Sequence, residues 1–108
     1  MNATPANSVD VDSYILDVLM QDLVGHDRSP SAFIVYMLLW RHSRARDRAT
    51  TTMSLREIAD GTGLSKRGVQ EAMIILVRRQ LVRVQRAGVT EIPTYTVECP
   101  WQRGIPSQ

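Results

Sequence analysis

Residues 55–82, LREIADGTGLSKRGVQEAMIILVRRQLV, constrain the fold of this chain more than any other stretch. Ser54 stands just before them and Glu57 follows three residues later, a pair that can close a first helical turn by reciprocal hydrogen bonds. The letters GTG, residues 61–63, favour a tight turn because glycine has unusual backbone freedom. Ser65 can then cap a second helix. The pattern predicts two short helices that meet at a steep angle.

The stretch GTGLSKRG could also be taken for a phosphate-binding loop, but its spacing excludes the two common forms. The dinucleotide fingerprint follows a buried strand and places its third glycine three residues after the second. Here Gly68 comes five residues after Gly63, and the element before them is helical. A P-loop needs Gly-Lys-Ser or Gly-Lys-Thr, which this stretch lacks. We therefore interpret the glycines as a turn between helices.

The elements on either side complete a mixed order of helices and strands. Ser29 and Pro30 are typical of a helix start, and the apolar run 32–40 predicts the central core helix. Basic residues follow at helical spacing, for which we favour a structural role at the helix end over phosphate contact; they are Arg41, Arg44 and Arg48. The letters ATTTM, residues 49–53, suggest a short strand. Alternation at 82–85 and 94–97 predicts a hairpin.

This order and the letters that carry it resemble a winged helix-turn-helix domain, as found in bacterial transcriptional regulators and in plasmid or phage replication initiators. The resemblance covers about residues 29–97. The matching positions, in chain order, are Ile58, Ala59, Gly63, Leu64, Ser65, Val69, Leu76 and Tyr95. It implies an α+β fold, mainly helical with a small antiparallel hairpin, and here with an extra N-terminal helix.

Three departures from the pattern of that family involve four positions. Gln80 stands where the family usually has glycine after its recognition helix, so a left-handed backbone is expected there at some cost. Gly68 replaces a more usual Thr or Ser and weakens the start of that helix. Ile74 and Ile75 occupy positions that are usually polar or basic.

The resemblance implies that helix 65–80 enters the major groove of duplex DNA and that wing 82–97 approaches the backbone. On a wheel of ~100° per residue, Ala72, Met73 and Leu76 lie within about 60° of Val69, so this is the expected core face. The predicted DNA-binding residues lie elsewhere on this helix and on the wing: Ser65, Lys66, Arg67, Gln70, Glu71, Arg78, Arg83 and Arg86. The open alternatives are an ordinary solvated face and, for Arg83, an ion pair with an acidic neighbour.

Residues 10–27 predict a separate N-terminal helix, after a disordered leader over 1–9. On the α-helical wheel its apolar side chains fill roughly 240°, about twice what one buried face requires. We assign Ile15, Leu19 and Leu23 to the home core, and expect Gly25 to end the helix. A homodimer interface is expected at Leu16, Met20 and Val24. The alternative is that Trp101, in the tail 99–108, covers this strip within one chain.

Charge and composition narrow the classes of function further. Residues 1–27 carry five Asp and no Lys or Arg, whereas residues 28–108 carry thirteen basic against six acidic groups, a net charge of +7. Arginine dominates this excess and suits phosphate and guanine contacts. The lone Cys99 fits a cytoplasmic protein. We expect no catalytic constellation, metal, cofactor or membrane span. We also expect no small-molecule effector, because only eleven residues follow Val97 and leave no room for an effector domain after the wing. The expected function is transcriptional regulation; a replication or partition factor and a protein-interaction module are the alternatives.

Overall fold

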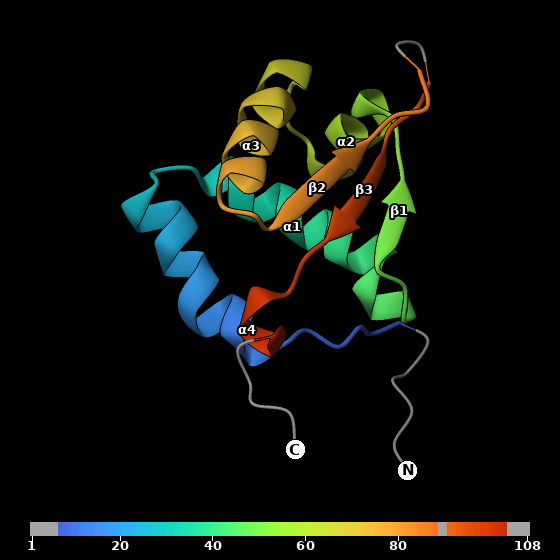
Figure 1. The fold of residues 1–108 in the computed structure, drawn as a ribbon. Helices are drawn as coiled ribbons and strands as arrows, with labels where there is room; N and C mark the ends of the chain where they lie inside the picture. Colours follow the sequence, from blue (N-terminus) through green and yellow to red (C-terminus); the bar gives the residue numbers. More distant parts are fainter. Residues whose placement is uncertain (1–6, 89–90, 104–108) are drawn as a thin grey trace.

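The computed structural model describes residues 7–88 and 91–103, in which several helices combine with a three-stranded antiparallel sheet. Figure 1 shows the helices gathered around α1, with a small sheet beside them. An N-terminal helix, 13–26, comes first and contains the segments Ile15–Leu19 and Asp22–His26. The later elements are α1 (Pro30–His42), a single turn at Arg44–Arg46, β1 (Thr50–Thr52), α2 (Leu55–Thr62), α3 (Lys66–Arg78), β2 (Val82–Gln85), β3 (Thr94–Val97) and α4 (Pro100–Arg103).

Helix α1 is the centre of the core, as its apolar run predicts. The Ser29 hydroxyl accepts a hydrogen bond from the Ala32 N–H at 3.2 Å, and Pro30 opens the helix. The helix packs against the N-terminal helix, α2, α3 and β3. One edge nevertheless remains open, because the Ile34 side chain is exposed.

The three basic residues do not share one helical face: Arg41 lies in the last turn of α1, as expected, but Arg44 and Arg48 lie beyond the helix, where that prediction is wrong. The helix ends at His42, and Arg44 belongs to the separate turn that follows. Its Nε and Nη2 atoms donate to the Val97 carbonyl at 3.0 and 2.7 Å. Arg44 therefore holds the end of β3. This role is structural, but it differs from the expected role at the end of the helix.

The sheet has three antiparallel strands in the order β1-β3-β2. The predicted hairpin is present, with Val82 opposite Val97 and Gln85 opposite Thr94. The threonine-rich β1 pairs with the outer side of β3, which makes β3 the central strand. Val84 departs from the expected inward alternation, because its side chain is exposed while Val82 is buried.

The turn between α2 and α3 is shorter than the sequence suggests. The predicted reciprocal bonds of Ser54 and Glu57 are confirmed at 2.8 and 3.0 Å. Gly63 has a φ of 82° and ends α2, but Gly61 lies inside the helix. A Cβ atom on Gly61 would approach Leu38 Cδ2 to 3.1 Å, so glycine serves close packing there.

The N-terminal helix is wound wider than the α-helix assumed from the sequence. Its bonds span five residues, as in the Asp27 N–H to Asp22 carbonyl bond of 2.9 Å, and it continues through Gly25, which was wrongly expected to end it. A wider turn brings side chains four residues apart closer to alignment. The apolar residues therefore form two stripes: Ile15, Leu19 and Leu23 are buried, whereas Leu16, Met20 and Val24 are exposed.

The described part of the tail folds back over the core. The Trp101 ring stacks on Tyr14 with ring centroids 4.9 Å apart, and its Nε1 donates to the Asp12 carboxylate at 3.0 Å. Trp101 therefore packs within its own chain. It does not cover the outer stripe of the N-terminal helix, since Leu16 is 48% exposed and Met20 is 39% exposed.

Gln80 takes the left-handed conformation expected from its position, with a φ of 59°. The Leu81 N–H bonds to the Leu76 carbonyl at 2.9 Å and the Gln80 N–H to the Val77 carbonyl at 3.0 Å, the double closure of a Schellman motif. The chain leaves α3 through this residue and enters β2. A side chain with a Cβ atom is strained in this conformation.

Replacing Gln80 with Gly should therefore raise the free energy of unfolding by roughly 0.5–1 kcal/mol, because glycine removes the strain of the left-handed backbone. Urea denaturation measures the change. The matched control is Gln85→Gly in β2, where the same exchange should destabilise the protein because the backbone φ is ordinary. If Gln80→Gly is less stable than the parent, the claim that Gln80 is strained is contradicted.

Candidate nucleic-acid interface

Helix α3 has one face in the core and the opposite face in solvent. Val69, Ala72 and Leu76 are fully enclosed against the rest of the domain. All six predicted binding residues of this segment are exposed: Ser65, Lys66, Arg67, Gln70, Glu71 and Arg78. The side of α3 away from the buried stripe therefore carries these polar and charged side chains together with the exposed Ile74 and Val77.

The first turn of α3 is fixed by Ser65. Its hydroxyl accepts a hydrogen bond from the Gly68 N–H at 3.0 Å. A Cβ atom on residue 68 would come within 3.3 Å of that hydroxyl oxygen, so a larger residue there would require the Ser65 side chain to shift by a few tenths of an ångström. The cap orients the exposed Lys66 and Arg67 side chains at the start of the helix.

Arg67 and Glu71 form an ion pair along the outer face, with Nε and Oε2 3.3 Å apart. Their side chains are 86% and 64% exposed, respectively. Such exposed pairs contribute only about 0.3–0.5 kcal/mol. Either group can therefore turn to an external partner with little loss of stability.

The hairpin brings a second set of side chains beside α3. Gln70 and Ile74 of α3 and Val84 and Arg86 of the hairpin line one open groove of about 750 Å³. Its other lining residues are Ser54, Leu55, Met73, Glu91, Ile92, Pro93 and Tyr95. Gln70 and Arg86, which the sequence proposes separately, thus face the same space.

Arg83, by contrast, is engaged within the chain. Its guanidinium donates to the Glu98 carboxylate, which is the acidic-neighbour alternative left open by the sequence. The Glu98 carbonyl in turn accepts from the buried Tyr36 hydroxyl at 2.8 Å. Arg83 remains on the surface but has a structural partner in Glu98.

Several exposed apolar side chains surround this groove, and the predicted site did not include them. Val84 and Ile92 belong to the hairpin, and Val77 lies one turn after Ile74 on α3. Ile74 is 58% exposed and Val77 is 45% exposed. The spacing of Ile74 and Val77 could have indicated from the sequence that both lie on the same side of α3. That Val84 and Ile92 join them depends on how the hairpin packs against the helix.

The described residues offer little for other kinds of site. They hold no group of three or more His, Cys, Asp or Glu side chains placed to share a metal ion. Burial raises the pKa of the Cys99 thiol and keeps it neutral. Within 7–88 and 91–103, no helix combines the length and apolar character that crossing a membrane requires.

Comparison with family models, curated proteins and solved structures gave no match.

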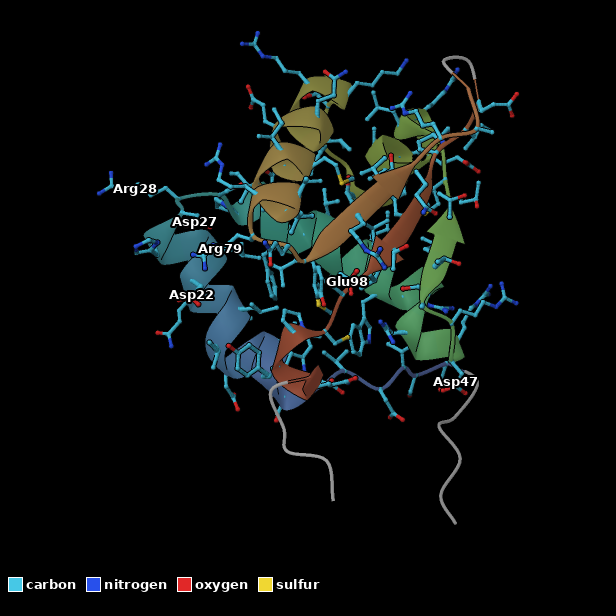
Figure 2. The ribbon with its side chains drawn as sticks, in the orientation of Figure 1. Asp22, Asp27, Arg28, Asp47, Arg79 and Glu98 are labelled. Carbon is cyan, nitrogen blue, oxygen red and sulfur yellow. The ribbon has the colours of Figure 1, made fainter. Side chains whose placement is uncertain are left out.

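The C-terminal end of α3 is tied to the N-terminal helix by an ion pair. Arg79 Nε and Nη2 donate to the two Asp27 carboxylate oxygens at 2.7 and 2.8 Å, and Figure 2 shows the side chains pointing toward one another. These hydrogen bonds, aided by His26, lower the pKa of Asp27 to about 2. The Asp27 side chain is only 17% exposed, so solvent screens the pair incompletely.

Because the pKa of Asp27 falls from 3.8 to about 2 on folding, its contribution to stability is present above about pH 4 and is lost as the pH falls toward 2. Asp27→Asn should lower the free energy of unfolding by about 1–2 kcal/mol at neutral pH. The difference from the parent should shrink at acid pH. Urea denaturation at several pH values measures both effects.

The control is Asp17→Asn, an exposed carboxylate on the same helix whose loss should change the stability little. Parallel stability curves for the parent and Asp27→Asn between pH 4 and pH 2 would contradict the role of the pair.

Proposed function

We propose that the protein binds duplex DNA as a winged helix-turn-helix domain. Helix α3 enters the major groove, and the β2–β3 hairpin lies against the phosphate backbone. The order α2, Gly63, α3 and hairpin supports this arrangement, since it places a capped helix beside a two-stranded ribbon. The major groove, about 12 Å wide, admits an α-helix.

One observation carries the proposal: cationic and amide side chains from both elements face the same side. Lys66 and Arg67 lie exposed at the start of α3, and Gln70 shares the groove with Arg86 of the hairpin. In Figure 1 the start of α3 and the loop end of the hairpin lie at one end of the molecule. The acidic N-terminal helix lies at the other end, where its carboxylates would not repel phosphate.

The role that we favour is a small bacterial transcriptional regulator in the cytoplasm. A plasmid or phage replication or partition factor would use the same DNA surface. Sequencing the genomic fragments that the protein selects separates these two roles, because promoters and replication origins are different targets.

The exposed Ile74 and Val77 favour one alternative of another class, a module that binds protein through this face. The response to salt discriminates between the two. DNA binding releases counterions and weakens steeply as salt rises, whereas association through apolar side chains does not. The net charge of +7 on residues 28–108 supports the DNA proposal.

We also propose that two chains associate through the outer stripe of the N-terminal helix. Leu16, Met20 and Val24 are all exposed there, on the stripe that the described tail leaves open. Two-fold dimers are the commonest oligomers, and such a dimer would match a palindromic site with half-sites one helical turn apart. The dimer contact would lie at the end of the molecule away from the start of α3.

If α3 contacts phosphate, replacing both Lys66 and Arg67 with Ala should weaken binding to random-sequence duplex DNA. Each lost phosphate contact should reduce the slope of log affinity against log salt by ~0.9. Fluorescence anisotropy over a salt series measures affinity and slope together.

The matched control removes two other exposed arginines, Arg46 and Arg48, which flank Asp47. Figure 2 places Asp47 at the end of the molecule away from the start of α3. This variant has the same net charge as the Lys66, Arg67 variant. It should nevertheless keep more of the parent's slope of log affinity against log salt. Equal slopes for the parent and the Lys66, Arg67 variant would contradict the proposed surface.

The dimer is tested by Leu16→Glu combined with Met20→Glu, which places two charges in the proposed contact. We expect a dimeric parent and a monomeric variant in sedimentation equilibrium at micromolar concentration, because unpaired buried charges oppose association. Ser13→Glu with Gln21→Glu is the control, since both residues are polar and exposed on the same helix. A monomeric parent, or a dimeric Leu16, Met20 variant, would contradict the interface.

A further inference from the structure

The outer face of α3 contains one apolar side chain among charged ones. Arg67, Glu71, Ile74 and Arg78 follow one another at intervals of four, three and four residues, which keeps them on one side of a helix. Ile74 is 58% exposed, and no other large hydrophobic side chain of the described residues has a larger exposed fraction. Ile74 lies between Arg67 and Arg78 along this face. The core is filled by the buried stripe on the opposite side of α3.

This face carries two cations, one of them paired with Glu71, and an exposed apolar side chain, and the combination has a complement in duplex DNA. Arg67 and Arg78 match the negative charge of phosphate. Among the base-pair edges in the major groove, the 5-methyl group of thymine is the most prominent apolar group. If this face lies in the groove, Ile74 meets either that methyl group or ordered water. Contact with the methyl group removes apolar surface from water on both partners.

We propose that Ile74 is a specificity-determining residue that contacts the 5-methyl group of thymine, so that the protein prefers A·T pairs opposite the middle of α3. The inference rests on the proposed binding of duplex DNA and adds to it the base that this helix selects. Val77, one turn further and 45% exposed, extends the apolar surface toward the hairpin side. Burial of one methyl group corresponds to about a fourfold change in affinity.

The test uses DNA that differs only in this methyl group. Duplexes that the parent retains from a random-sequence library are amplified once with thymine and once with uracil, and the affinity for each pool is measured at fixed salt. We expect the uracil pool to bind more weakly, by about fourfold for each thymine contacted. Ile74→Ala should bind the thymine pool more weakly and should no longer distinguish the two pools.

The matched control is Ile34→Ala, the same truncation at a 40% exposed position of α1, which should keep the parental preference for thymine. Because Ile74 is exposed and Ala favours helices, the variant should fold, and circular dichroism verifies this. Comparing parent and variant on both pools isolates the contact between this side chain and the methyl group.

The outcomes separate the two proposals. A parent that binds both pools equally, or an Ile74→Ala variant that keeps the preference, overturns the thymine contact and leaves DNA binding standing. A parent that binds neither pool overturns the DNA proposal, and the thymine contact falls with it. If the protein associates with another protein chain in the absence of DNA, and Ile74→Ala abolishes that association, this face binds a protein partner. That outcome likewise overturns the inference.

Discussion

The packing of α3 against α1 is the constraint on which the rest of the structure depends. Val69, Ala72 and Leu76 of α3 and Val35 and Leu39 of α1 have little or no exposed surface. A rotation of α3 would expose this apolar stripe and bury the charged residues opposite, at a cost of several kcal/mol. The hydrophobic core thereby determines which side chains α3 presents to a partner.

The two ends of α3 are held by different interactions, and each matters for that presentation. Ser65 closes the first turn by accepting from Gly68, while the bonds around Gln80 close the last turn. Asp27 then ties the following Arg79 to the N-terminal helix. The helix is thus fixed in rotation and in position, and the hairpin that begins at Val82 is placed beside it.

The surface separates into regions of different chemistry. The outer stripe of the N-terminal helix, Leu16, Met20 and Val24, is apolar and belongs to an acidic segment. The face of α3 combines cations with Ile74 and adjoins the groove shared with Arg86. An apolar stripe in an acidic setting suits a second copy of the chain better than a polyanion, whereas cations beside a helix and a hairpin suit DNA. These physical differences support assigning association and DNA contact to opposite ends.

The sequence by itself determined the helix starts at Ser29, Ser54 and Ser65, the hairpin and the left-handed Gln80, because each depends on residues close together in the chain. It also determined which face of α3 is apolar. Only the tertiary structure decided that β1 joins β3, that Arg44 holds Val97 and that Arg79 pairs with Asp27, since these contacts join residues 42–53 positions apart. The groove lined by Gln70 and Arg86 was also decided only by the tertiary structure. It depends on how the hairpin packs beside α3, which local sequence patterns do not specify.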